Sequence, residues 1–278
     1  MNIVVRIAFF FTAFLFISVQ QSFSLGFRET IPLSGGGVLP AYCFVPHQGI
    51  KARIPGVIVG VGVGSTKILQ YHAYCQHLAD QNFFVVLIDP SNFPESLAPG
   101  PFSWEKGPGR VVGDINQAIV AGRLAVTSKW YLNSIRATVD YLCRSPMVDP
   151  TRIVLTGHSQ PANAALTYAC QDPRIRAVVW NYGGSPWVMP YEPLRLPPVL
   201  IFHGTDDEVY DVKYAEKLIM ELHTSGRDYE AYIYPHQKHM FNVMYDLQRE
   251  NRFMKPVILD AFGHLISFLC RVLQYPCN

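Results

Sequence analysis

Apolar and polar residues alternate along the chain in blocks that predict strands and helices in turn. Short runs rich in Val and Ile indicate buried strands at 55–61, 83–88 and 199–202. Longer segments, including 67–81 and 114–143, place apolar residues at helical spacing. Strands that alternate with helices in this way form a mainly parallel sheet with helices on both faces, so the fold class is α/β.

The remaining expected elements continue the alternation. They are strands at 37–45, 152–156, 175–180 and 229–234, and helices at 160–170, 212–224 and 256–273. Two stretches rich in proline and aromatic residues, 90–109 and 183–198, are too irregular for a strand or a helix. Long loops inside a compact domain are often functional. Ligands of open parallel sheets bind beyond the carboxyl ends of the strands, so we look for chemistry there.

Length and composition support one large domain. The chain has 278 residues, of which 49% are apolar and 16% charged, which is typical of a globular protein with a well-buried core. The formal net charge is +2 and there is no long basic run, which argues against nucleic acid as the main partner.

The N-terminus predicts export. A positive charge at Arg6 precedes an apolar run over 7–19, and small residues follow at Ser22 and Ser24. This order is that of a cleaved signal peptide, here residues 1–24, with an uncleaved anchor as the alternative. The mature domain is then 25–278, secreted or periplasmic, with no stable membrane span after cleavage.

Export changes how the cysteines are interpreted. The expected mature chain holds six cysteines, an even number that permits disulfides in an oxidising compartment. Cys270 and Cys277, neighbours near the C-terminus, are the first candidates for a bridge. The alternative is that several cysteines are buried, unpaired thiols. No Cys-x-x-Cys pair occurs, so neither a zinc site nor a redox motif is indicated.

The clearest chemical signal lies at the end of the strand predicted at 152–156. Gly157-His158-Ser159 leads directly into a helix-forming segment, the layout of a nucleophile elbow. There the N–H of Gln160 and the helix dipole would face a developing oxyanion. The usual second glycine of the elbow is Pro161 here. Proline suits the first turn of a helix and leaves the N–H of Gln160 intact, although it biases Gln160 away from helical geometry.

An acid and a histidine should follow the serine in that order. Asp207 comes directly after the strand 199–202 and would orient a histidine, with Asp206 as the rival. His239, in the loop after the strand 229–234, is the candidate base, with His236 as the rival.

A second oxyanion donor should come from the loop after the strand 55–61. Gly62 is the candidate in a glycine-rich stretch, with Val61 and Val63 as alternatives. Such a loop can also bind phosphate, but neither the Walker nor the Rossmann spacing is present.

These motifs together resemble the α/β-hydrolase superfamily, and within it the dienelactone-hydrolase-like branch. The resemblance rests on the stretches 55–65, 147–159, 203–207 and 234–241, and it extends over about 54–273. It implies an α/β-hydrolase fold, a mainly parallel twisted sheet of about eight strands, and a triad of Ser or Cys with Asp and His. The nucleophile position holds Ser159, which favours a general carboxylesterase over dienelactone chemistry itself.

The expected activity is hydrolysis of a small-molecule carboxylic ester or thioester through an acyl-enzyme on Ser159, with no metal and no organic cofactor. Phe93, Trp104 and Trp187, from the two irregular stretches, are candidates for the substrate pocket, or else ordinary packing residues. A peptidase of the same fold and a non-catalytic binding protein are the alternative functions.

Overall fold

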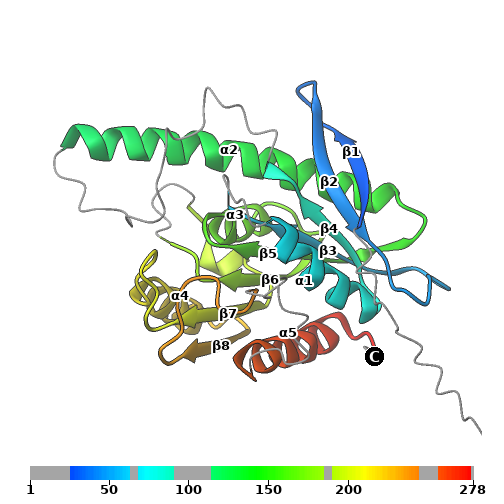
Figure 1. The fold of residues 1–278 in the computed structure, drawn as a ribbon. Helices are drawn as coiled ribbons and strands as arrows, with labels where there is room; N and C mark the ends of the chain where they lie inside the picture. The colour runs from blue at the N-terminus through cyan, green and yellow to red at the C-terminus, as the bar shows by residue number, and fades with distance from the viewer. Residues whose placement is uncertain (1–25, 63–67, 91–113, 185–189, 244–255, 277–278) are drawn as a thin grey trace, which may run out of the picture.

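A computed structural model describes residues 26–62, 68–90, 114–184, 190–243 and 256–276, without the side chains of 68–70 and 114–127. Its strands form one eight-stranded sheet in the order β1-β2-β4-β3-β5-β6-β7-β8 (Figure 1). The strands are β1 (Phe27–Pro32), β2 (Val38–Phe44), β3 (Ile54–Gly60), β4 (Phe84–Ile88), β5 (Val148–His158), β6 (Ile175–Asn181), β7 (Val199–Gly204) and β8 (Tyr229–Tyr234).

The sheet is mainly parallel, as predicted. Strands β1, β2 and β4 pair antiparallel, whereas every pair from β4 through β3 to β8 is parallel. Every residue of β3, β4 and β7 is buried, because helices cover both faces of the sheet. The edge strand β1 was not predicted. It joins β2 through a turn that contains Gly36 and Gly37 at φ of 86° and 82°, a conformation that favours glycine.

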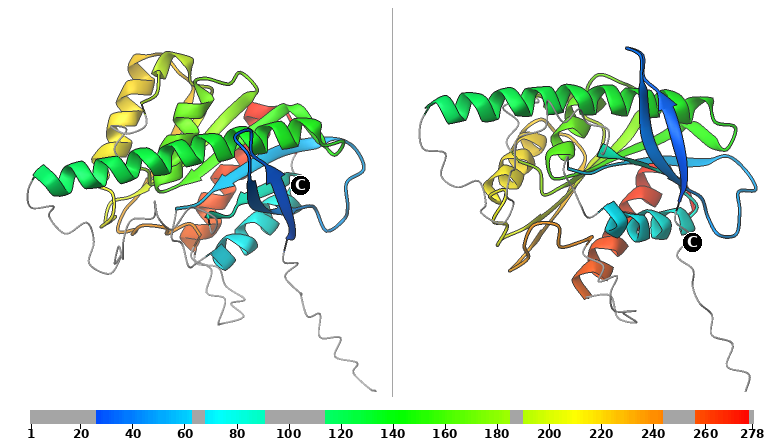
Figure 2. Two further views of the ribbon diagram at one scale, coloured as in Figure 1. Left: turned by 90° about the horizontal axis from the view of Figure 1, so that it is seen from above. Right: turned by 45° about the horizontal axis from the view of Figure 1, so that its top comes forward.

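Five α-helices are described, and they divide between the two faces of the sheet (Figures 1 and 2). They are α1 (Ile68–Asp80), α2 (Asp114–Arg144), α3 (Gln160–Ala169), α4 (Lys213–Thr224) and α5 (Pro256–Leu273), with a short 3₁₀ helix η5 (Pro193–Arg195) before β7. Side chains of α2, α3 and α4 join the core on one face, and those of α1 and α5 join the core on the other. The alternation predicted from the sequence is therefore confirmed.

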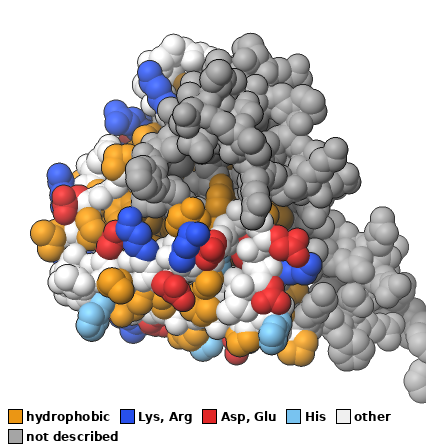
Figure 3. All heavy atoms as spheres, turned by 90° about the vertical axis from the view of Figure 1, so that its left-hand side faces the viewer, with side chains coloured by type: hydrophobic (Ala, Val, Ile, Leu, Met, Phe, Trp, Pro, Cys, Tyr) orange, Lys and Arg blue, Asp and Glu red, His pale blue; other side chains and the backbone are white. Residues whose placement is uncertain are grey.

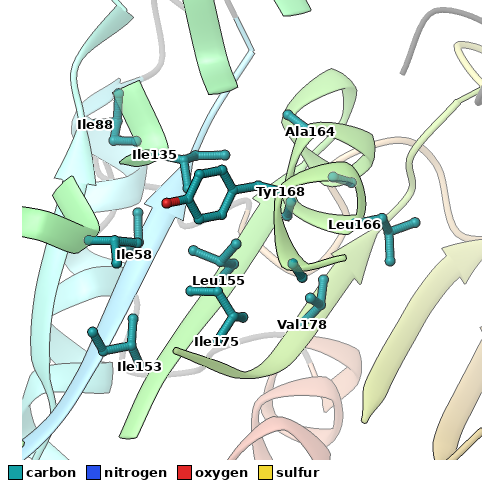
Figure 4. Packing of buried hydrophobic residues seen from close by; sticks show 14 of the residues in the cluster. Ile58, Ile88, Ile135, Ile153, Leu155, Ala164, Leu166, Tyr168, Ile175 and Val178 are labelled. Carbon is teal, nitrogen blue, oxygen red and sulfur yellow. The ribbon is translucent and has the colours of Figure 1, made fainter. Parts of the chain in front are cut away.

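Helix α3 packs against β5, β6 and α2, and its position sets the geometry of the elbow. All nine residues 161–169 are buried. Figure 4 shows Tyr168 of this helix beside Ile135 of α2 and Leu155 of β5. Complete burial of one aliphatic side chain contributes about 1.5–3 kcal/mol, so this packing anchors the helix that begins beside Ser159.

Among the described residues, α5 is the helix that is long and apolar enough to cross a membrane. Core helices of soluble proteins have the same property, and Leu265, Phe268 and Leu269 of α5 are buried against the sheet. On the face seen in Figure 3, acidic, basic and apolar side chains are intermixed, and neither charge sign forms a continuous patch over the described atoms. This surface, like the small net charge, gives no indication of a nucleic-acid partner.

Candidate active site

Three polar side chains meet beyond the carboxyl ends of β5, β7 and β8. Ser159 follows β5, Asp207 lies in the loop after β7, and His239 lies in the loop after β8. Strands β5 to β8 are consecutive parallel neighbours, so their carboxyl ends share one edge of the sheet. Residues that are far apart in the sequence are thereby brought to one place.

Ser159 occupies a strained position between β5 and α3. Its φ is 68° and its ψ is −131°, a conformation that a residue with a side chain rarely adopts. Strain of this kind costs on the order of 1–3 kcal/mol and must be held by the surrounding structure. The Ser159 N–H donates to the carbonyl of Asn181 at 3.0 Å, and the Ser159 carbonyl accepts from the N–H of Ala162 at 3.0 Å. Gly157 permits this turn, because an added Cβ would lie 2.4 Å from the backbone of Ala162.

The imidazole of His239 bridges the serine and the aspartate. Its Nε2 lies 3.0 Å from Oγ of Ser159, and its Nδ1 lies 2.7 Å from Oδ2 of Asp207. A carboxylate only accepts hydrogen bonds, so Nδ1 carries the proton and Nε2 is free to accept the proton of Ser159. We refer to these three side chains as the Ser–His–Asp array.

The acid of the array is buried and held by the main chain. The side chain of Asp207 is 0% exposed, and its Oδ1 accepts the N–H groups of Val209 and Tyr210 at 2.8 and 2.9 Å. These bonds leave Oδ2 directed at His239.

The two rivals considered from the sequence lie outside the array and face each other. His236 and Asp206 are exposed, and Nδ1 of His236 lies 3.4 Å from Oδ2 of Asp206. An ion pair between exposed side chains contributes little to the stability of the protein. The geometry thus selects His239 over His236 as the partner of Ser159, and Asp207 over Asp206 as the partner of His239.

Two sets of contacts hold the histidine loop in place. Gly204 at the end of β7 lies directly against Gln237, where an added Cβ would come within 2.1 Å of the Gln237 carbonyl oxygen. Farther along the loop, Nδ2 of Asn242 donates to Oδ1 of Asn181 at 2.8 Å. Asn181 in turn donates to the carbonyl of Gly157 at 3.1 Å. A buried amide pair therefore links the loop of His239 to the elbow of Ser159.

Comparison with known proteins identifies the family of the chain. Residues 39–256 match the Dienelactone hydrolase family. The chain belongs to this family. It is therefore a hydrolase.

Individual relatives in this family and fold are distant. A protein of Yersinia pestis named "Putative carboxymethylenebutenolidase" is 24% identical over 227 residues, which cover 78% of this chain and 79% of that protein. The crystal structure of "Putative Dienelactone Hydrolase" from Klebsiella pneumoniae superposes with a TM-score of 0.64 at 19% identity, covering 88% of this chain and 98% of that one. Esterase 2 of Thermogutta terrifontis, phosphorylated by paraoxon, gives a TM-score of 0.62 at 15% identity, covering 90% and 95%. These likenesses confirm the α/β-hydrolase fold.

This dienelactone hydrolase family member also buries groups near the site that the sequence analysis did not single out. His158, directly before Ser159, is 0% exposed and shares a 2.7 Å hydrogen bond between its Nδ1 and the hydroxyl of Tyr182. Burial, with a smaller effect of the nearby His239, lowers the pKa of His158 to about 3. His158 is therefore neutral at physiological pH. Its position directly before Ser159 in the sequence could have indicated that this histidine lies close to the site.

Two further residues surround the acid. His203 donates its Nε2–H to the carbonyl of Tyr210 at 2.9 Å, and burial lowers the pKa of His203. A neutral His203 makes its 3.6 Å approach to Asp207 a packing contact rather than an ion pair. The ring of Tyr210 also makes an edge-to-face contact with His239, with a centroid separation of 5.8 Å. Its position three residues after Asp207 was the only sequence signal for it.

The two predicted oxyanion donors come from two separate segments of the chain. Gln160 is the first residue of α3, and its N–H is one of those that a helix leaves without an intrahelical partner. Gly62 follows β3, and an added Cβ there would meet nothing within 4 Å. Their joint action on a substrate oxygen remains a prediction.

Several sequence predictions fall on residues outside the described part of the chain. These are the pocket residues Phe93, Trp104 and Trp187, the alternative donor Val63, the signal peptide at 1–24 and Cys277 of the predicted bridge.

The other cysteines and possible metal ligands can be described. Cys43, Cys75, Cys143 and Cys170 are free thiols. Within the described ranges, no group of three or more His, Cys, Asp or Glu side chains could hold a metal ion.

Proposed function

We propose that this protein is an exported serine hydrolase that cleaves carboxylic esters or thioesters through an acyl-enzyme on Ser159. The observation that carries the proposal is the position of His239, whose two ring nitrogens lie 3.0 Å from Oγ of Ser159 and 2.7 Å from Oδ2 of Asp207. A serine hydroxyl is a weak nucleophile until a neighbouring base removes its proton, and His239 is in place to do so.

In the first half of the reaction, Nε2 of His239 takes the proton of Ser159 as Oγ attacks the carbonyl carbon. The N–H groups of Gln160 and Gly62 would bind the oxygen that becomes negative. His239 then gives its proton to the departing alcohol or thiol. In the second half, water repeats the sequence on the acyl group, and Asp207 keeps the Nδ1–H tautomer of His239 throughout. No step requires a cofactor.

The first test is covalent labelling of Ser159 by a fluorophosphonate. We expect the wild-type protein to be labelled with mass gain on Ser159, and Ser159→Ala to remain unlabelled. The phosphorylation of the structurally similar Thermogutta terrifontis esterase by paraoxon supports this choice of reagent. Labelling at another residue, or the absence of labelling in a folded wild-type protein, would refute the proposal and favour a non-catalytic binding protein.

Turnover then separates ester from peptide chemistry. We expect p-nitrophenyl esters of short and medium acyl length to be hydrolysed, and chromogenic peptide anilides to be left intact. Efficient anilide cleavage would instead identify a peptidase. Substitution of the predicted pocket residues Phe93, Trp104 and Trp187 by Ala should change the preference for acyl length rather than the labelling of Ser159.

Export and the disulfide belong to the same proposal. If residues 1–24 are a signal peptide, N-terminal sequencing of the secreted or periplasmic protein should begin near residue 25. Four of the six cysteines are free thiols, which supports a bridge between the remaining pair, Cys270 and Cys277. Non-reducing peptide mapping should recover the two in one linked peptide. Retention of residues 1–24 in a membrane fraction would identify an anchor instead.

A further inference from the structure

A second series of contacts joins Ser159 to His239 through two buried side chains. His158 precedes Ser159 at the end of β5, and Tyr182 directly follows β6. Nδ1 of His158 lies 2.7 Å from the hydroxyl of Tyr182, and the Tyr182 ring contacts the imidazole of His239. Ser159 and His239 are therefore connected directly, by the 3.0 Å approach of Nε2 to Oγ, and also through this buried pair.

The ring of Tyr182 packs closely against the imidazole of His239. The two ring centroids are 4.7 Å apart, and the ring planes make an angle of 65°. Aromatic rings favour such edge-to-face arrangements. Tyr182 is fully buried, and Phe241, which belongs to the same loop as His239, packs against the tyrosine at 6.2 Å. The Tyr182 ring thus limits how far the imidazole can turn.

The backbone of Tyr182 has a conformation that is uncommon for a residue with a bulky side chain. Its φ is 38°, in the positive range. Such a conformation persists only when the surrounding structure holds it. The Tyr182 N–H donates to the carbonyl of Phe202 in β7 at 2.7 Å, which ties the end of β6 to the neighbouring strand. In this conformation the phenol contacts both His158 and His239.

Helix α1 holds His158 in place. The rings of Tyr71 and Tyr74 contact the His158 imidazole edge-to-face, with centroid separations of 5.1 and 5.3 Å. His158 and Tyr182 are both 0% exposed, so solvent does not compete for their hydrogen bond. Burial lowers the pKa of His158 to about 3. His158 therefore carries no charge in the neutral range that would oppose protonation of His239.

We propose that Tyr182, anchored by His158, is a positioning residue that sets the orientation of the His239 imidazole relative to Oγ of Ser159. This inference rests on the proposed serine hydrolase function. The hydrogen bond between Nδ1 and Asp207 still lets the imidazole pivot about that contact, and the Tyr182 ring restrains this rotation. The restraint matters because a misplacement of about 1 Å near the reacting groups can reduce the rate by about 100-fold.

The direct test is Tyr182→Phe, which keeps the ring and removes the hydroxyl that binds His158. We expect kcat for p-nitrophenyl esters and the rate of fluorophosphonate labelling to fall by about 3- to 10-fold, with KM nearly unchanged. Tyr182→Leu also removes the aromatic contact with His239, and it should reduce both rates by about 30- to 100-fold.

The matched control is Tyr168→Phe, in the last turn of α3. Tyr168 is buried, and its hydroxyl donates to Oδ2 of Asp172 at 2.6 Å, so this variant also loses a short phenol hydrogen bond in the core. We expect it to lower the midpoint of thermal unfolding but to keep the wild-type rates. An equal loss of activity in Tyr168→Phe and Tyr182→Phe would show that activity follows stability alone, and it would overturn the proposal.

A spectroscopic measurement detects the orientation of the imidazole without turnover. The proton on Nδ1 of His239, in its 2.7 Å hydrogen bond to Asp207, should give a downfield proton resonance. We expect this resonance to shift or broaden in Tyr182→Phe and to keep its wild-type position in Tyr168→Phe. An unchanged resonance in both Tyr182→Phe and Tyr182→Leu would overturn the positioning role.

The anchoring by His158 is tested by combining two substitutions. His158→Leu removes the partner of the Tyr182 hydroxyl, so that hydroxyl has no bond to His158 left to lose. Adding Tyr182→Phe to His158→Leu should therefore lower kcat by less than about twofold. A loss in this background as large as that in wild type would show that His158 does not anchor Tyr182.

The outcomes separate this inference from the function on which it rests. If wild-type protein is labelled at Ser159 and turns over esters, but Tyr182→Phe and Tyr182→Leu match it in both rates, the positioning role is overturned and the proposed function stands. If folded wild-type protein is neither labelled nor active, the proposed function itself fails, and the role of Tyr182 in catalysis fails with it.

Discussion

Pro161 of α3 packs directly against Gly60 of β3, so that a Cβ added to Gly60 would lie 3.0 Å from the Cβ of Pro161. A nucleophile elbow ordinarily has a second glycine at the position of Pro161, because helix and strand approach closely there. In this protein the proline occupies that space in the first turn of α3, and the absent side chain is on the neighbouring strand. Helix α3 and strand β3 can therefore still approach closely, because the glycine is on the strand instead of on the helix.

This exchange predicts an energetic coupling between the two positions. In the wild-type background, Gly60→Ala should lower the free energy of unfolding by about 1–3 kcal/mol, because the new methyl group meets Pro161. In a Pro161→Gly background, the same change should be neutral or slightly stabilising, since the clash is gone and the unfolded chain loses entropy. Urea unfolding of the four proteins measures the coupling. Additive effects of the two substitutions would contradict this explanation of Pro161.

The variants Asp207→Asn and Asp206→Asn should differ greatly in their loss of activity, although the two aspartates are adjacent. The side chain of Asp207 is fully buried and orients His239, so an amide there disturbs the tautomer and should reduce kcat by about 10³–10⁴-fold. Asp206 is exposed at the surface, and its amide variant should remain within about threefold of wild type. Steady-state ester hydrolysis with matched thermal unfolding curves gives the comparison. Equal losses of kcat in the two variants would show that catalysis does not depend on the orientation of His239 by Asp207.

The two histidines of the same loop form a second matched pair. His239→Gln should abolish measurable turnover, at least about a 10³-fold loss, because His239 is the imidazole that lies within hydrogen-bond distance of Oγ of Ser159. His236→Gln changes an exposed side chain whose closest charged neighbour is Asp206, and it should retain wild-type kinetics. Full activity in His239→Gln would require a different general base and would refute the assignment.

Buried His158 should make the stability of the protein depend on pH. Its pKa is about 3 in the folded state and 6.5 for the free side chain, so below pH 6.5 the unfolded chain binds a proton that the folded chain does not. The free energy of unfolding should therefore fall with pH between about 6.5 and 3, by at most about 1.4 kcal/mol per pH unit from this group.

The measurement for His158 is chemical unfolding at pH 7 and pH 5. His158→Gln should reduce the loss between these two values by about 2 kcal/mol, even if the variant is less stable at pH 7. Burial also lowers the pKa values of His72 and His203. The free energy of unfolding of the variant should therefore still depend on pH, but less steeply. Parallel pH profiles for wild type and variant would show that His158 does not titrate in this way.

Most of the sheet could be predicted because its strands are buried on both faces and therefore consist mainly of apolar residues. The runs around 54–60, 84–88 and 199–204 are apolar on both faces, and each forms a strand within two residues of its predicted limits. Strand β1 could not be predicted in the same way, because Phe27–Pro32 is largely exposed and lacks a continuous apolar run. Its pairing with β2 at the sheet edge, rather than its composition, defines it as a strand.

For the candidate site, the sequence by itself determined the order of Ser159, Asp207 and His239 and the placement of each after a strand. Local pattern carries this information, because apolar runs mark the strands and glycines mark the turns that end them. Only the tertiary structure decided between Asp207 and Asp206 and between His239 and His236, residues that lie one and three positions apart. Which of two nearby polar side chains turns inward depends on the backbone amides of Val209 and Tyr210 and on the packing of Gly204 against Gln237. These contacts join separate segments of the chain, and they exist only once the sheet has assembled.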